Sequence, residues 1–179
     1  MANEPSGFRV EPARAAEETE RQRTVLWLNH FDLLPGDDSV QTSHDAVSSG
    51  VGGGLTGLVV TSTTTGEVTK GGGNKVVHMA VAVPPGYLVR GVRLGYELTD
   101  SGSHVSQIRL AQVQNPPGTA VVLLDDGTNH TGVGPAYVNS APTSIDPARG
   151  PLLLSLRVNF GDTSDRICVR GLGLRLVPK

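Results

Sequence analysis

Cysteine is nearly absent from this chain. Cys168 is the only one among 179 residues, so no disulfide can form within one copy. Aromatic residues are also scarce, at 4% of the sequence, so aliphatic packing must hold the fold together. The N-terminus has no apolar signal-peptide core, and no apolar run approaches the roughly 18 residues of a membrane span. We therefore expect no membrane association and, by default, a cytoplasmic protein, with signal-independent export as the alternative.

Positive charge is not concentrated anywhere in the sequence. The formal net charge is −2, and no block of lysine and arginine stands out. Because phosphate contacts dominate nucleic-acid affinity, a nucleic-acid-binding protein normally carries a basic stripe. The nearest approach is Arg166, Arg170 and Arg175, and strand alternation separates Arg175 from the other two unless the strand changes phase. We expect no nucleic-acid partner.

Glycine and proline are abundant, with 23 and 12 residues, and they separate stretches rich in valine, serine and threonine. This pattern is typical of short strands joined by turns. Helical periodicity is nearly absent, so the crossover helices of a parallel sheet have no counterpart here. The sequence therefore predicts an all-β fold, an antiparallel β-sandwich with jelly-roll-like connectivity.

Three segments differ in composition. Residues 1–23 are polar and predict an irregular or partly helical N-terminal arm. Residues 24–73 combine strand-like stretches with a Gly/Ser-rich loop at 36–57, which we expect to lie outside the core; whether this segment belongs to the core or is appended to it stays open. Residues 74–179 contain seven or eight strand-like stretches and predict the sandwich core.

Two stretches make specific predictions. Residues 119–124 are apolar on both faces, which predicts a strand in the middle of the fold. Residues 151–160 alternate strictly, and the phase of the last strand changes at Gly171, which predicts a bulge. The segment between these two strands, 161–165, predicts the turn of a β-hairpin. The rival interpretation, a site built on Asp162 and Asp165, has only two carboxylates, fewer than a hard cation requires.

Motifs for catalysis and cofactors are missing. A G-x-G-x-x-G match at 52–57 precedes a strand-like run instead of a helix, so it does not predict a dinucleotide site. The five histidines lack metal-site spacing, no G-x-S-x-G elbow occurs, and Cys168 lies on an apolar strand. We expect no catalytic residue, no metal and no cofactor. A small hydrolase using scattered Asp and His residues is the second alternative to the functions below.

The sequence favours a non-enzymatic β-sandwich that forms homo-oligomers and acts in assembly or protein interaction, because its strands are poor in charge and carry many small residues. The first alternative is a glycan- or ligand-binding module of a surface or tail-fibre-like protein. For that function the candidate ligand-binding residues are Tyr87 and Tyr137, the aromatics best placed to be exposed, together with Asp125 and Asp126.

Overall fold

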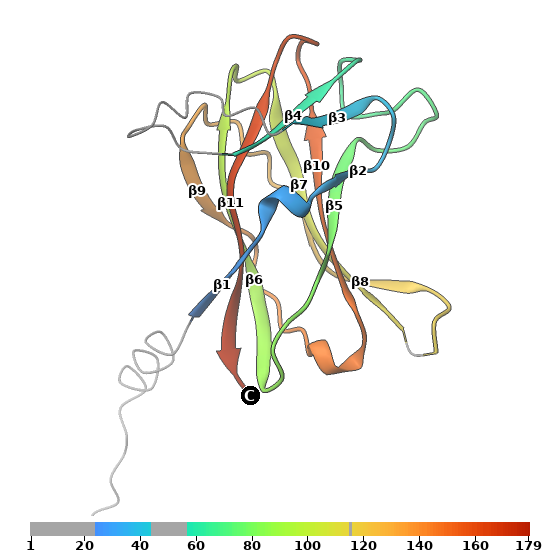
Figure 1. Ribbon diagram of the computed structural model, residues 1–179, viewed down its shortest axis with the longest axis vertical. Helices are drawn as coiled ribbons and strands as arrows, with labels where there is room; N and C mark the ends of the chain where they lie inside the picture. Colours follow the sequence, from blue (N-terminus) through green and yellow to red (C-terminus); the bar gives the residue numbers. More distant parts are fainter. Residues whose placement is uncertain (1–23, 44–56, 115) are drawn as a thin grey trace, which may run out of the picture.

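The computed structural model describes residues 24–43, 57–114 and 116–179, and in it two antiparallel sheets face each other across an apolar core (Figure 1). This confirms the predicted all-β sandwich. None of the helical segments in the described ranges is long or apolar enough to span a bilayer. The predicted arm at 1–23 lies outside the described residues.

Sheet A is built around its two longest strands, β6 and β11, which pair along most of their lengths. Its order is β3 (Val40–Ser43), β4 (Leu58–Ser62), β11 (Ile167–Pro178), β6 (Tyr87–Leu98) and β9 (Ala136–Asn139). The short strand β1 (Thr24–Leu28) also pairs with β11, beyond the part that pairs with β4. Since β6 pairs with one edge of β11, β1 and β4 both pair with its opposite edge, one after the other along the strand.

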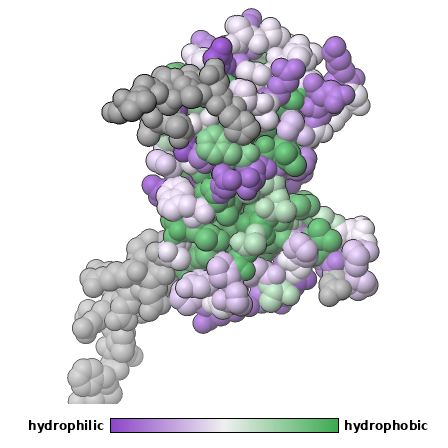
Figure 2. All heavy atoms as spheres, in the orientation of Figure 1, coloured by the Kyte–Doolittle hydropathy of each residue, from purple (hydrophilic) through white to green (hydrophobic). Residues whose placement is uncertain are grey.

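Sheet B has five strands, in the order β2 (Leu34–Pro35), β5 (Val76–Val81), β10 (Leu152–Asn159), β7 (His104–Val113) and β8 (Ala120–Asp126). The chain passes from sheet A to sheet B through β1, the 3-10 turn η1 (His30–Asp32) and β2. A second 3-10 turn, η2 (Pro147–Arg149), precedes β10. Figure 2 shows hydrophobic residues gathered across the middle of the molecule, between more hydrophilic ends.

The core consists of the alternate residues that each sheet directs inward. On β10 and just beyond it, the alternation predicted for 151–160 is confirmed, because every second residue is at most 1% exposed: Leu152, Leu154, Leu156, Val158 and Phe160. Sheet A contributes a matching set from β11, including Leu172 and Leu174, both fully buried. Aliphatic packing between the sheets is therefore the main source of stability.

The predicted phase change in the last strand is also confirmed. The register of β11 against β6 shifts between Val169 and Gly171. Val169 and Leu172 consequently both point inward, although one is odd-numbered and the other even. The same shift places Arg170 and Arg175 together on the outer face of sheet A, which simple alternation does not predict.

The predicted hairpin between the last two strands is wrong. β10 lies in sheet B, where β5 and β7 occupy both of its edges, so β11 cannot pair with it and joins sheet A. The connecting residues still show turn chemistry. Asp162 accepts hydrogen bonds from the backbone and hydroxyl of Ser164, both at 2.8 Å, and Asp165 accepts one from the Ser103 hydroxyl at 2.6 Å. Both carboxylates are thus engaged in holding a crossing between sheets.

Two further predictions need correction. Part of the loop predicted at 36–57 is strand β3, where Val40 is buried in the core; residues 44–56 lie outside the described ones. The apolar stretch 119–124 forms most of β8, which is an edge strand because it pairs only with β7. Its Val121 and Leu123 are exposed and line an open cleft.

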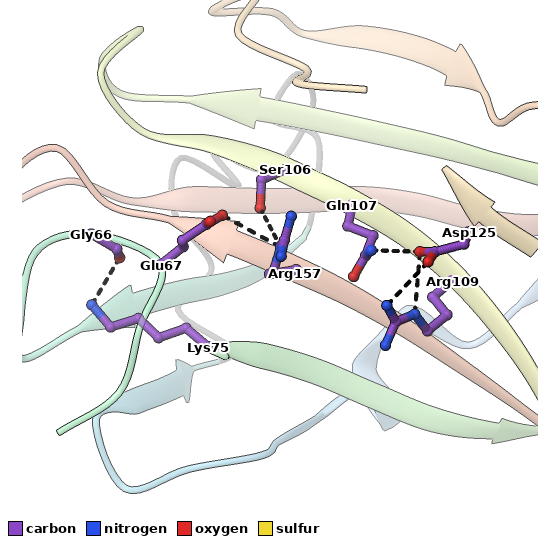
Figure 3. A network of polar contacts seen from close by, with 8 residues as sticks. All are labelled: Gly66, Glu67, Lys75, Ser106, Gln107, Arg109, Asp125 and Arg157. Atoms are coloured by element: carbon purple, nitrogen blue, oxygen red, sulfur yellow. Dashed lines mark hydrogen bonds and ion pairs between the residues drawn. The ribbon is translucent and has the colours of Figure 1, made fainter. Parts of the chain in front are cut away.

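A buried lysine organises the connection between β4 and β5. Lys75 is fully buried, and its ammonium group donates hydrogen bonds to the carbonyl oxygens of Thr64, Thr65 and Gly66, the last at 2.9 Å (Figure 3). A buried charge is tolerable only when its donors are satisfied. Here all three protons have acceptors, so the lysine holds the loop 63–75 against the sandwich.

Candidate functional site

Glycines form a bare strip on the outer face of sheet A. Gly95 of β6 is the register partner of Gly171 of β11, and both lie at outward positions, as does Gly173. Aromatic side chains from the two flanking strands, β9 and β1, lie over Gly95 and Gly173. Tyr137 of β9 is the register partner of Gly95, and Trp27 of β1 is the partner of Gly173.

The two aromatic rings lie directly on this strip. A Cβ atom on Gly95 would be 2.5 Å from Cε1 of Tyr137, and one on Gly173 would be 3.1 Å from Cε3 of Trp27. Both distances are shorter than ordinary van der Waals contact, so only glycine leaves room for the rings in these positions. The glycine strip therefore lets both aromatic rings pack directly against the backbone of sheet A.

Trp27 and Tyr137 are nevertheless open to solvent. Each is 54% exposed, although large aromatics are usually well buried. Their ring centroids are 5.8 Å apart and their planes meet at 66°, an edge-to-face pair. The two rings thus form an angled, exposed aromatic surface on a rigid sheet.

One arginine lies against this aromatic surface. The guanidinium carbon of Arg93 lies 5.1 Å from the centre of the Tyr137 ring, within cation–π range. Farther along the face, Arg170 forms an ion pair with Glu97 through both Nε and Nη2. This pair borders a small pocket of about 80 Å³ that Cys168 also lines. Burial raises the pKa of the Cys168 thiol, which disfavours the reactive thiolate.

The structure separates the four residues predicted to bind ligand. Tyr137 lies on the outer face of sheet A, as just described. Tyr87, at the start of β6, is half-buried and packs against the core, so its predicted exposure is only partial. Asp125 lies on the outer face of sheet B, where Gln107 and Arg109 donate hydrogen bonds to it (Figure 3).

Asp126 has a role inside the fold. It is 8% exposed and accepts hydrogen bonds from the backbone and hydroxyl of Thr128 and from the backbone of Ala141. Burial by itself would raise the pKa of this carboxyl group, but these hydrogen bonds outweigh it and hold the pKa below the ordinary value. Asp126 thereby ties the end of β8 to the segment after β9. Ligand binding by these four residues stays a prediction.

Trp27 is the exposed aromatic that sequence reasoning did not select. The signal was available in β1, where Leu26 and Leu28 share one phase of the strand and Trp27 takes the other. A tryptophan in the outward phase of a short strand is a candidate contact residue. Its pairing with Tyr137 could not be read from the sequence, because 110 positions separate them and strand order decides their proximity.

A larger cleft of about 500 Å³ lies beside β8, lined by Gln112, Val121, Leu123, Asp146 and others. None of its lining residues is aromatic. Two of its polar residues are already engaged: the Gln112 amide donates to the carbonyls of Asp146 and Gly150, and Lys179 pairs with the Asp146 carboxylate at 2.7 Å. Across the described ranges, no group of three or more His, Cys, Asp or Glu residues could hold a metal ion.

Comparison with known proteins identifies the fold but no family. No protein-family model and no curated protein matches the chain. Among solved structures, carbohydrate-binding module CBM36 in complex with calcium and xylotriose is 11% identical with a TM-score of 0.45, over 84% of this chain and 98% of that one. A family 29 carbohydrate-binding module is 11% identical with a TM-score of 0.41, over 86% and 87%.

The CBM22-1–GH10 modules of Clostridium thermocellum xylanase 10B, complexed with xylohexaose, are 10% identical with a TM-score of 0.50. The match covers 86% of this chain and 28% of that one, which contains a GH10 module as well. At this identity the likeness concerns the fold alone. The chain has the two-sheet β-sandwich fold found in carbohydrate-binding modules.

Proposed function

We propose that this protein is a glycan-binding module whose binding surface is the outer face of sheet A around Trp27 and Tyr137. The observation that carries the proposal is the pair of exposed aromatic rings held on a glycine strip. This is the first alternative raised by the sequence, now attached to a specific surface.

The chemistry of a sugar ring suits this surface. A pyranose has apolar C–H faces and a rim of hydroxyl groups, so it can cover an aromatic ring while its rim bonds to polar neighbours. Burying apolar area contributes about 25 cal/mol per Å². At the rim, Arg93 and Asn139, which are register partners beside the rings, supply donors and an acceptor for the hydroxyls. Because the rings are already in place, little entropy is lost on binding.

The fold gives further support. Two of the solved neighbours are described as complexes with xylo-oligosaccharides, and the one at a TM-score of 0.50 is bound to xylohexaose. Only the fold is shared with them, so the identity of their ligands is not carried over. What the fold supplies is a stiff sheet whose outer face can present side chains to a long, flexible chain.

The self-associating module that the sequence favoured has less support. Its remaining basis is the outer face of sheet B, where Leu34, Val122 and Leu153 are exposed. Assembly through this face and homo-oligomer formation stay predictions. They are compatible with glycan binding, because the two outer faces point away from each other.

The test is a screen of the purified protein against an array of oligosaccharides and against soluble polysaccharides. We expect binding to at least one glycan, and a loss of at least tenfold in affinity for Trp27→Ala and for Tyr137→Ala. Leu34→Ala, at a side chain 61% exposed beside sheet B, is the matched control and should bind normally. Circular dichroism should show that every variant remains folded. Full binding by Trp27→Ala, or no binding by the folded wild type, would overturn the proposal.

A further inference from the structure

We propose that the glycan is acidic, a chain bearing carboxylate groups such as uronic acids, and that Arg93 and Arg175 bind those groups. This inference rests on the proposed function and names its ligand class. It starts from an imbalance of charge. The strands of sheet A carry one acid, Glu97, and four arginines, namely Arg90, Arg93, Arg170 and Arg175.

The register of the strands places two of these arginines beside the aromatic rings. One row across the outer face runs from Trp27 of β1 through Gly173 of β11 to Arg93 of β6. The next outward row runs from Val25 through Arg175 to Gly91. A sugar stacked on Trp27 would therefore have Arg93 across the glycine strip from it and Arg175 in the neighbouring row.

The charges of Arg93 and Arg175 are not neutralised within the fold. Neither forms an ion pair with a carboxylate among the residues that the structure describes. The acid of the sheet, Glu97, is already held by Arg170. Both residues are half-buried. An incoming carboxylate would supply the missing partner, and the planar fork of arginine matches its two oxygens.

The strands of the opposite sheet do not show this imbalance. The two arginines on the strands of sheet B are both paired, Arg109 with Asp125 at 3.2 Å and Arg157 with Glu67 at 3.4 Å (Figure 3). A face with paired charges has little to gain from a charged ligand. Two arginines without an ion pair in the described part of the chain, Arg93 and Arg175, lie beside the exposed rings, which is the arrangement that recognition of an acidic sugar requires.

Single-stranded nucleic acid is the other polymer that stacks on aromatics and arginine. The observations favour a glycan, because the strands of sheet A contain no lysine and the whole chain is slightly acidic. A nucleic-acid groove normally tracks the phosphates with a continuous positive stripe. An acidic polysaccharide needs only a cation beside each bound uronate.

The experiment compares glycans that differ only in charge. The array contains neutral and uronate-containing oligosaccharides on several backbones. In a separate titration, the protein is mixed with polygalacturonate, with its fully methyl-esterified form, or with single-stranded oligodeoxythymidylate. We expect the protein to bind polygalacturonate about tenfold more tightly than the methyl-esterified form. This difference in affinity should shrink as the salt concentration is raised. Arg93→Gln and Arg175→Gln should each weaken acidic-glycan binding by about tenfold. Because Arg93 also contacts the sugar hydroxyls in the proposed site, Arg175→Gln is the variant that should change binding to neutral glycans by less than about twofold. Arg109→Gln, which removes the same charge from sheet B, should leave both unchanged.

The outcomes separate the two proposals. Binding confined to neutral glycans, or equal binding to charged and esterified forms, overturns the acidic ligand and leaves glycan binding intact. No binding to any glycan overturns the proposed function and this inference with it. Tighter binding of the oligodeoxythymidylate than of every acidic glycan also overturns both. Equal losses for Arg93→Gln and Arg109→Gln would show that net charge, and not the site, is responsible.

Discussion

The outer faces of the two sheets differ far more than their inner faces do. Sheet A presents two exposed aromatic rings on glycine, with Arg93 and Arg175 beside them. Sheet B presents exposed aliphatic residues such as Leu153 and arginines that are already paired. Both sheets obey the same alternation, so the difference comes from what occupies the outward positions. A sandwich can thus devote one face to recognition without changing its core.

The inner faces, by contrast, are nearly equivalent. Sheet B contributes leucines from β10, and sheet A contributes leucines from β11, all essentially inaccessible to water. The core excludes the polar chemistry that distinguishes the outer faces. We therefore expect stability to depend on both sheets and ligand binding on sheet A alone.

The largest expected effect tests the equivalence of the inner faces. Leu154→Ala in sheet B and Leu174→Ala in sheet A should each lower the free energy of unfolding by about 2–5 kcal/mol, through lost burial and the cavity left behind. Urea denaturation monitored by circular dichroism gives both values. A loss in one variant several times larger than in the other would mean that the two sheets do not share the core equally.

A smaller effect tests the glycine strip. Gly95→Ala should force the Tyr137 ring off its position, because the new methyl group would be 2.5 Å from Cε1. We expect a loss of about 1–3 kcal/mol in the free energy of unfolding, typical of overpacking, and about tenfold weaker glycan binding. The matched control is Ala80→Val on the outer face of sheet B, which should change stability by less than about 0.5 kcal/mol. Unchanged binding by Gly95→Ala would show that the strip does not position the ring.

The smallest effect concerns the connection between the sheets. His130 lies in the segment 127–135 between β8 of sheet B and β9 of sheet A, and its Nε2 is buried without a hydrogen-bond partner in the described part of the chain. Burial lowers the pKa of His130, Asp126 partly raises it, and His104 lowers it further. Burial also lowers the pKa of His30.

Below the ordinary histidine pKa of 6.5, the unfolded chain holds more protons than the folded one. The free energy of unfolding should therefore be fully retained above pH 6.5 and decrease as pH falls through the lowered pKa of His130. His130→Gln should reduce this loss between about pH 8 and about pH 5, with His30 accounting for part of what remains. Identical pH profiles for the variant and the wild type would exclude His130 as the group responsible.

Some parts of the fold followed directly from sequence patterns. The alternation at 151–160 and the phase change at Gly171 were predictable because burial of one face imposes a period of two. Interpretations that depended on the neighbours of a strand failed. The stretch 119–124 is apolar enough for the interior, yet β8 is an edge, and the turn at 161–165 has hairpin chemistry but joins two sheets.

The candidate site was less accessible to sequence reasoning than the fold. Tyr137 was selected for its expected exposure, whereas Trp27 was not selected, and Asp125 belongs to the opposite sheet. Arg170 and Arg175 were assigned to different faces unless the strand slipped, and the bulge does bring them together. Each of these outcomes depends on pairing between strands distant in sequence.

The sequence by itself determined that the chain forms β-strands with one buried face, because the spacing of apolar residues is local and the hydrophobic effect acts on each strand separately. Only the tertiary structure decided which strands are neighbours, and hence that Trp27, Tyr137 and Arg93 meet over a strip of glycine. The physical reason is that strand pairing uses backbone hydrogen bonds, which are the same for every residue type, so the order of strands is set by the packing of the whole core.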